Sequence, residues 1–193
     1  MGTRDSTRNR LLDATDEVVF AGGDTTAPVD RILERAGVSP ATLYRAYGSK
    51  EELVAAALDR RHREWLDAWD AAVARAATDR GRLLAVFDAL EEFEARADGA
   101  RWCAFLGTAA GYAELPPVLA AAVRQDSDSL RARLQTLAEP VAGPRASDLA
   151  EAVLLVVSGH LAMRLRPGAA GAPVSTAREV GSVLVGHAAR ARR

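Results

Sequence analysis

The chain has 193 residues, of which 49% are hydrophobic and 5% aromatic, and this length allows one or two domains with hydrophobic cores. Its 25 basic and 26 acidic residues leave a net charge of −1, so the composition alone does not indicate a nucleic-acid-binding protein. The single cysteine, Cys103, excludes an intrachain disulfide and indicates a reducing compartment.

The residue pattern of the N-terminal segment predicts two helices. The first ten residues lack the apolar core of a signal peptide. A first helix is predicted from about Thr7 to Ala21, where apolar residues recur at helical spacing, and Gly22 and Gly23 end it. Pro28 is expected to open a second helix, because proline suits the first helical position, where its missing N–H would find no partner.

A helix-turn-helix pattern covers the run from Glu34 to Leu53. Apolar residues recur at helical spacing up to Ala36, and Gly37 supplies the tight turn that follows. Ser39 is expected to cap the next helix, with Pro40 at its first position.

The second helix of this motif is short and exposes contact groups. Leu43 and Tyr47 lie four residues apart and are expected to face inward. Gly48 ends the helix, and Ser49 with Glu52 forms a capping box for the next one. The other positions of the short helix therefore face outward, which fits a helix that enters the major groove of DNA.

Leu11 to Leu53 resembles the DNA-binding domain of the tetracycline repressor (TetR) family of bacterial transcriptional regulators. The ordered string A-G-V-S, T-L-Y, an aromatic at Tyr47 and S-K-E-E-L matches the central signature of that family. The resemblance implies an all-α fold. It consists of an N-terminal three-helix helix-turn-helix DNA-binding domain, residues 1–50, and a C-terminal helical bundle for effector binding and dimerisation, residues 51–193.

The resemblance implies a double-stranded DNA operator as a partner and assigns roles within the short helix. Ala41, Thr42 and Arg45 are the candidates for base readout, since arginine can bridge guanine and a small methyl group can contact thymine. Tyr44 and Lys50 are the candidates for phosphate contacts, which set the register of binding.

Three further residues belong to the predicted DNA-binding set. Ser39 and Pro40 begin the short helix, and Thr26 precedes the second helix, where it either contacts a phosphate or satisfies only its own turn. Residues 1–65 carry ten basic and eleven acidic groups, an unusual balance for a DNA-binding domain. We expect the bases to cluster on one face and the affinity to be modest and salt-sensitive.

Helices are predicted throughout the remainder of the chain. A long helix starts at Lys50 and continues to about Val73. Further helices are predicted over residues 82–96, 102–112, 117–138, 146–165 and 176–190, with connectors at 98–101, 114–116, 139–144 and 167–173. The longest apolar stretch, about residues 152–163, is interrupted by polar residues and is too short for a membrane span. We expect a cytoplasmic protein with no membrane partner.

The middle helices carry large side chains that are candidates for an effector pocket, because the resemblance implies an inducer site there. Each of them is individually more typical of a hydrophobic core than of a pocket. A mostly apolar pocket would favour a hydrophobic or aromatic effector. The candidates are His62, Trp65, Trp69, Phe87, Trp102, Phe105, Tyr112 and Met163.

The last two helices carry broad apolar faces that resemble the dimerisation surface of the family. Pairing two helices from each subunit would bury these faces in a four-helix bundle with a twofold axis. The alternative is an ordinary core within one chain. The residues predicted for the dimer interface are Val153, Val156, Val157, His160, Val180, Val183, Leu184 and His187.

Enzymatic motifs are lacking in the sequence. The three histidines are far apart, and no paired-cysteine motif, H-E-x-x-H motif or glycine-rich phosphate loop accompanies them. We therefore predict no catalytic residues, metal site or cofactor. The expected function is a ligand-responsive regulator, a repressor that binds a pseudo-palindromic operator as a homodimer and is released by its effector. The alternatives are a constitutive or architectural DNA-binding protein and, less favoured, a helical-bundle enzyme.

Overall fold

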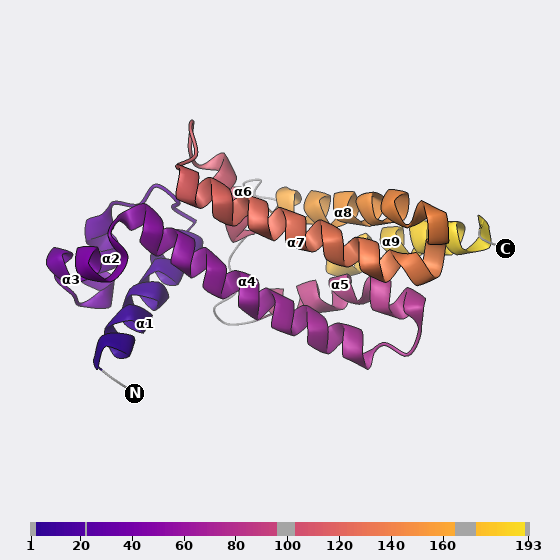
Figure 1. Ribbon diagram of the computed structural model, residues 1–193, viewed down its shortest axis with the longest axis horizontal. Coiled ribbons are helices and arrows are strands. Elements are labelled where there is room, and N and C mark those ends of the chain that lie inside the picture. The colour runs from indigo at the N-terminus through magenta and orange to yellow at the C-terminus, as the bar shows by residue number, and fades with distance from the viewer. Residues whose placement is uncertain (1–2, 22, 96–102, 165–172, 192–193) are drawn as a thin grey trace. The chain divides into compact units, whose positions relative to one another are not determined.

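Helices make up all the regular structure in a computed structural model of the chain, which describes residues 3–21, 23–95, 103–164 and 173–191 (Figure 1). Within these ranges no strand occurs, so the predicted all-α fold is confirmed. The elements are α1 (Thr3–Thr15), the π-helix η1 (Asp16–Ala21), α2 (Val29–Ala36), α3 (Pro40–Tyr47), α4 (Lys50–Arg75), α5 (Asp79–Glu94), α6 (Ala104–Ala110), α7 (Pro117–Ala142), the 3-10 turn η2 (Gly143–Arg145), α8 (Ala146–Met163) and α9 (Val174–Ala191).

Helix α7 extends beyond its predicted end. A connector was expected over residues 139–144, but the helix continues through Pro140 to Ala142. Proline lacks its own N–H and therefore leaves one carbonyl of the preceding turn without its helical donor. Glu139 and Pro140 are exposed, so water can solvate the backbone there and the helix tolerates the proline close to its end.

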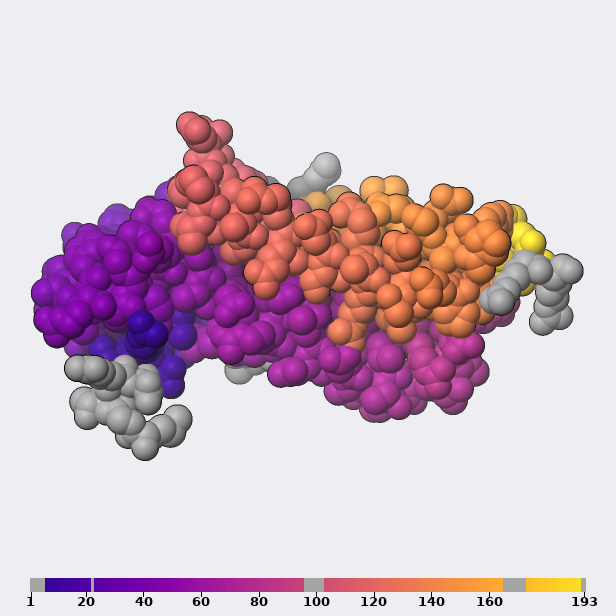
Figure 2. All heavy atoms as spheres, in the orientation of Figure 1, coloured from indigo at the N-terminus to yellow at the C-terminus, as the bar shows by residue number. Residues whose placement is uncertain are grey.

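The chain forms two compact units. Unit 1 consists of residues 1–63 and 97–125, and it contains α1, η1, α2, α3, α6 and the first parts of α4 and α7. Its core brings residues of the predicted helix-turn-helix together with Ala104 of α6 and Leu119 of α7. Between α6 and α7 the chain projects from this unit, and Ala113 and Glu114 are exposed there (Figure 2). The fully buried residues of this core include Leu11, Phe20, Ile32, Leu43, Leu53 and Leu58.

Unit 2 consists of residues 64–96 and 126–193, and it contains the later parts of α4 and α7 together with α5, α8 and α9. Helix α9 approaches α5 closely at Gly181, where a Cβ atom would lie 2.6 Å from the ring atom Cε2 of Phe87. The core of this unit includes Trp69, Leu83, Phe87, Leu134, Val153, Val157 and Val185.

The compact units differ from the predicted domains. The sequence divides the chain by function at residues 50 and 51, whereas α4 and α7 each contribute to both compact units. The functional division into residues 1–50 and 51–193 stays a prediction.

One helical stretch is more apolar than the sequence analysis indicated. Pro117–Met163 contains an 18-residue window with a mean hydropathy of 1.4, which has the length and composition of a membrane span. This corrects the expectation that no segment reaches that length. The stretch is not one helix, because η2 separates α7 from α8, and a single window of this kind is also common in core helices of proteins outside membranes.

Candidate nucleic-acid interface

The turn between α2 and α3 depends on Gly37. Its φ angle is +62°, a left-handed conformation that favours glycine. The N–H of Gly37 donates to the Glu34 carbonyl at 3.2 Å, and the N–H of Val38 donates to the Leu33 carbonyl at 3.2 Å. This pair of bonds is a Schellman motif, which ends α2 and satisfies two of its last carbonyls.

Helix α3 begins as the sequence predicts, but its cap differs. Ser39 is extended and Pro40 occupies the first turn, and the Ser39 carbonyl accepts from the N–H of Thr42 at 3.0 Å. The Ser39 hydroxyl makes no capping bond to the backbone. Instead its Oγ lies 2.9 Å from Oγ1 of Thr42, so the two hydroxyl groups hold each other at the start of the helix.

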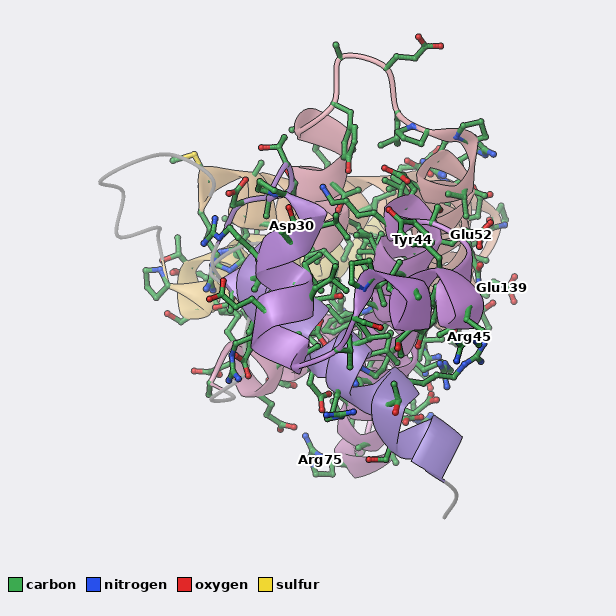
Figure 3. All side chains as sticks on the ribbon, turned by 90° about the vertical axis from the view of Figure 1, so that its left-hand side faces the viewer. Asp30, Tyr44, Arg45, Glu52, Arg75 and Glu139 are labelled. Carbon is green, nitrogen blue, oxygen red and sulfur yellow. The ribbon has the colours of Figure 1, made fainter. Side chains whose placement is uncertain are left out.

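The outward face of α3 carries the residues predicted to read DNA. Leu43 is fully buried, whereas Ala41, Tyr44 and Arg45 are exposed and Thr42 is half-buried. Tyr44 is 52% exposed, which is high for an aromatic residue (Figure 3). The structure therefore brings the candidate contact residues of α3 onto one accessible surface.

Lys50 lies at the start of the next helix and is half-buried. Gly48 ends α3 with a φ angle of +77°, and its N–H donates to the Tyr44 carbonyl at 3.0 Å. The N–H of Glu52 donates to the Ser49 hydroxyl at 3.0 Å, which is the serine half of the predicted capping box. These bonds fix the chain between α3 and α4, and thereby the place of Lys50 beside α3.

Ion pairs account for the unusual charge balance of this region. Five arginines are paired with acidic groups, whereas among the described residues Arg8, Arg10, Arg45 and Lys50 have no ion pair. The acids therefore neutralise bases away from α3, and Arg45 on its exposed face has no acidic partner. The pairs are Arg31 with Asp24 at 3.0 Å, Arg35 with Glu17, Arg60 with Asp13 at 2.7 Å and with Asp16, Arg61 with Asp16 at 3.2 Å, and Arg63 with Asp59 at 3.0 Å.

Thr26 is exposed but engaged in its own turn. Its hydroxyl donates to Oδ1 of Asp24 at 2.9 Å, and the N–H of Ala27 donates to the Asp24 carbonyl at 3.1 Å. The sequence left two roles open for Thr26, a phosphate contact or a hydrogen bond within its own turn, and this geometry favours the second.

The predicted effector residues fall into separate groups. In unit 1, the rings of His62 and Phe105 meet edge to face with centroids 6.2 Å apart, and the Tyr112 hydroxyl donates to the Thr25 carbonyl at 3.4 Å. In unit 2, Trp65 lies 5.6 Å from Trp69 between ring centroids.

The remaining effector candidates differ in burial. Phe87 is buried against Gly181, and Met163 is 42% exposed. Trp102 lies outside the described residues. Trp69 is fully buried, and its Nε1–H has no hydrogen-bond partner among the described residues.

A cavity of about 480 Å³ in unit 2 contains none of the predicted effector residues. It is lined by α4, α5 and α9, with two ion pairs at its wall: Arg75 with Glu92, and Arg178 with Asp88. Sequence reasoning missed this cavity because charged residues on helices are typical of a solvated surface.

The predicted dimer residues also divide by burial. Val153, Val157 and His160 are buried in the chain itself, so they expose little surface to a second copy. Val156 and Leu184 are half-buried, and His187 is exposed. The exposed aliphatic surface of α8 and α9 consists of Leu155 (74% exposed), Val180 (47%) and Val183 (65%). The periodicity of α8 did not identify Leu155, because apolar residues occur on several of its faces.

Comparisons with known proteins agree on one family. Residues 11–57 match the family model of bacterial regulatory proteins of the tetR family. No group of three or more potential metal ligands occurs in the part of the chain that the structure describes.

Two curated relatives match part of the chain. The HTH-type transcriptional activator FasR of Mycolicibacterium smegmatis is 37% identical over 90 residues, which cover 47% of this chain and 41% of that protein. The HTH-type transcriptional regulator BetI of Brucella anthropi is 33% identical over 79 residues, which cover 41% of each chain. The chain therefore matches less than half the length of these relatives.

Solved structures match almost the whole chain. A TetR-family transcriptional regulator from Streptomyces coelicolor has a TM-score of 0.79 and 24% identity, with coverage of 97% of this chain and 96% of that chain. A TetR transcription regulator from Haloarcula marismortui has a TM-score of 0.79 and 18% identity, with coverage of 95% and 98%. At these identities the likeness shows the fold.

Proposed function

We propose that this chain, whose residues 11–57 match the tetR family model, is a transcriptional regulator of that family rather than an enzyme, and that it acts as a ligand-responsive repressor. It binds a pseudo-palindromic operator in double-stranded DNA as a homodimer, and a small, largely apolar effector releases it. Its place of action is the cytoplasm, where it requires no cofactor.

The exposed face of α3 is the observation that carries this proposal. An eight-residue helix presents Ala41, Tyr44 and Arg45 to solvent, and Arg45 lacks an ion pair among the described residues. An unpaired guanidinium can donate two hydrogen bonds to guanine in the major groove, and the tyrosine and Lys50 can hold phosphates.

The exposed aliphatic surface of α8 and α9 supports the homodimer. Water contact with Leu155, Val180 and Val183 is unfavourable, and a second copy of the same surface would remove it. A twofold axis also places two copies of α3 at a fixed separation, which must match one helical turn of DNA or a multiple of it.

The effector mechanism couples ligand binding to that separation. Helix α4 is one continuous helix of 26 residues that contributes to both compact units, so a ligand that tilts it respaces the two copies of α3. A coupling free energy of ~1–3 kcal/mol would lower operator affinity about five- to 150-fold.

The test is selection of bound fragments from random duplex DNA, followed by affinity measurement on the selected duplex. We expect a palindromic consensus with two half-sites. Arg45→Ala and Tyr44→Ala should abolish binding to it while gel filtration still shows a dimer. Release of the selected duplex by a hydrophobic or aromatic compound tests the effector step. Unaltered binding by Arg45→Ala would refute the assignment of α3 to base readout.

Activation is a second candidate, favoured by the relative FasR, which is a transcriptional activator. The same DNA contacts serve both functions. A reporter gene placed behind the selected duplex distinguishes them, because its expression falls with a repressor and rises with an activator.

A further inference from the structure

Helix α3 is anchored at its centre by Leu43, its one fully buried residue. Toward its C-terminus, Ala46 and Tyr47 are half-buried and pack against the core of unit 1. Arg45 lies in this last turn of α3, so its direction depends on how the Ala46–Tyr47 end of the helix is held.

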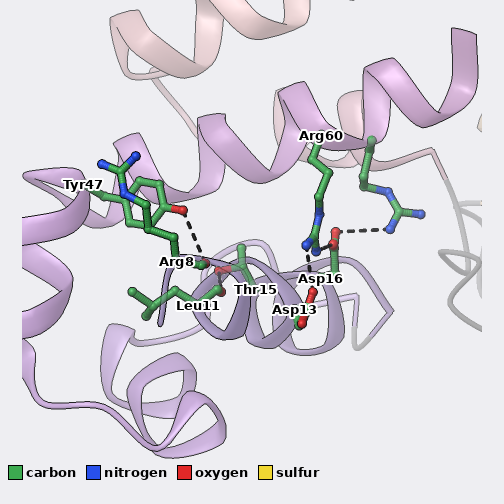
Figure 4. Close-up of polar contacts among 8 residues, drawn as sticks. Arg8, Leu11, Asp13, Thr15, Asp16, Tyr47 and Arg60 are labelled. Carbon is green, nitrogen blue, oxygen red and sulfur yellow. Dashed lines mark hydrogen bonds and ion pairs between the residues drawn. The ribbon is translucent and has the colours of Figure 1, made fainter. Parts of the chain in front are cut away.

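Arg8 of α1 contacts this C-terminal end directly (Figure 4). Its Nη2 donates to the Ala46 carbonyl at 2.6 Å, and its guanidinium carbon lies 5.2 Å from the centroid of the Tyr47 ring. The Tyr47 hydroxyl donates in return to the Arg8 carbonyl at 3.4 Å. Arg8 is therefore joined to Tyr47 by one hydrogen bond and a cation–π contact, and to the Ala46 carbonyl by a second hydrogen bond.

The chemistry of this contact suits a helix terminus. The Ala46 carbonyl is one of the last four of α3, which have no partner within the helix, and a cation there is also favoured by the helix dipole. Burial raises the pKa of the Tyr47 hydroxyl, so the phenol keeps the proton that it donates. The planar guanidinium of arginine can stack on an aromatic ring and at the same time donate hydrogen bonds from its edge. The ammonium group of lysine has no such plane.

Ion pairs to α4 hold helix α1 in place, and therefore also hold Arg8, which lies on α1. Arg60 of α4 pairs with Asp13 of α1 at 2.7 Å and with Asp16 at the start of η1 (Figure 4). Arg61 also pairs with Asp16, at 3.2 Å, and stacks over Phe20 at 5.6 Å from the ring centroid. These contacts join the residues C-terminal to Arg8, in α1 and η1, to helix α4.

We propose that Arg8 is a positioning residue of the DNA-binding site: it fixes the C-terminal end of α3, and thereby the direction of Arg45. The inference rests on the proposed function. Arg8 acts through α3, because its guanidinium contacts Ala46 and Tyr47, and the salt dependence measured below distinguishes this role from a phosphate contact.

The first experiment measures amide hydrogen exchange in the free protein. In Arg8→Ala, exchange at Tyr44 to Gly48 should be at least tenfold faster than in the wild type. The matched control is Arg10→Ala, since Arg10 is exposed on the same helix and, among the described residues, its side chain bonds only Thr7, at 3.5 Å. Equal exchange rates in the wild type and Arg8→Ala would overturn the proposal. This measurement requires no DNA, so it separates a failure of the proposal from a failure of the proposed function.

The second experiment uses the duplex selected with the wild-type protein and a random-sequence duplex of equal length. Arg8→Ala should bind the selected duplex about tenfold more weakly, with unchanged affinity for the random duplex and unchanged salt dependence. A lost phosphate contact would instead lower the slope of log affinity against log salt by about one per half-site, and that result would contradict positioning.

A double-mutant cycle completes the test. Once Arg45→Ala has removed the group that Arg8 positions, adding Arg8→Ala should cause little further loss of affinity for the selected duplex. Additive losses would contradict the proposal, as would an affinity loss that equals the loss of folded protein measured by circular dichroism. Arg8→Lys should restore part of the affinity, because lysine can donate to the Ala46 carbonyl but stacks less well on Tyr47.

Discussion

The two compact units expose surfaces of different chemistry. Unit 1 exposes an aromatic ring and an unpaired guanidinium on α3, and ion pairs join other charged residues of this unit, as between Arg60 and Asp13 and between Arg61 and Asp16. Unit 2 exposes aliphatic side chains on α8 and α9. The first surface suits a polar, negatively charged partner, and the second suits a partner that excludes water. The difference indicates that the proposed DNA-binding surface and the proposed self-association surface can be altered separately.

The largest expected effect comes from a charge placed in the aliphatic surface of unit 2. Val183→Glu should convert the dimer into a monomer, because an ionised carboxylate cannot be buried against Leu155 and Val180 of a second copy without a partner. Analytical ultracentrifugation measures the change. Since Val183 is 65% exposed in the single chain, circular dichroism should show an intact helical fold.

The same substitution tests whether DNA binding by unit 1 depends on dimerisation through unit 2. Loss of the dimer should weaken binding to the selected duplex by at least a hundredfold, although none of the residues proposed to contact DNA has changed. Ser182→Glu is the matched control, because Ser182 is an exposed polar residue of α9 and should leave the dimer intact. A Val183→Glu protein that remains dimeric would show that this surface does not join two copies.

A pair of glycine substitutions tests the packing within unit 2. A Cβ atom at Gly181 would lie 2.6 Å from Phe87 Cε2, and the buried ring cannot move away cheaply. Gly181→Ala should therefore lower the free energy of unfolding by about 1–3 kcal/mol. Gly186 of the same helix has only the end of Arg190 nearby, at 3.6 Å. Gly186→Ala should raise the free energy by about 0.5–1 kcal/mol, because alanine favours the helix.

Urea unfolding measures both changes, and their opposite signs are the result to look for. Equal stabilisation by the two alanines would mean that α9 does not approach α5 as closely as the Gly181 contact indicates.

Sequence reasoning succeeded where structure is set locally. The bounds of α3 follow from residues within the helix and its turns, chiefly Gly37, Pro40 and Gly48, each of which restricts the backbone by its own chemistry. The same reasoning predicted that Leu43 is buried and that Tyr44 and Arg45 are exposed, since one inward side chain fixes the outward face of a short helix.

Sequence reasoning failed where contacts between residues distant in the chain determine which side chains are buried. In α8, six consecutive apolar residues, Ala152 to Val157, leave the inward face undetermined, and packing in unit 2 buries Val157 while Leu155 remains exposed. The Arg8 contact was equally inaccessible, because Ala46 and Tyr47 lie 38 and 39 residues away in the chain. His62 and Trp65 are close together on α4, yet they belong to different compact units, which the sequence did not indicate.

The smallest expected effect concerns one carboxylate in unit 2. Glu94 of α5 accepts a hydrogen bond from His160 at 3.0 Å and pairs with Arg164. Burial alone would raise the pKa of Glu94, but the His160 bond and the Arg164 charge together outweigh it and lower the pKa below its ordinary value. A carboxylate with a lowered pKa in the folded state stabilises the fold at pH values above its ordinary pKa of about 4.3.

That contribution is lost as the pH falls from the ordinary pKa through the lowered one, because the carboxylate then binds a proton and gives up its ion pair. The free energy of unfolding of the wild type should therefore fall more steeply below about pH 4.3 than that of Glu94→Gln, which carries no titrating group. Glu91→Gln is the control, since Glu91 is exposed on the same helix. Parallel pH profiles for the wild type and Glu94→Gln would show that Glu94 titrates alike in the folded and unfolded chain. The contacts with His160 and Arg164 would then add nothing to the stability of unit 2, and its packing would rest on apolar contacts alone.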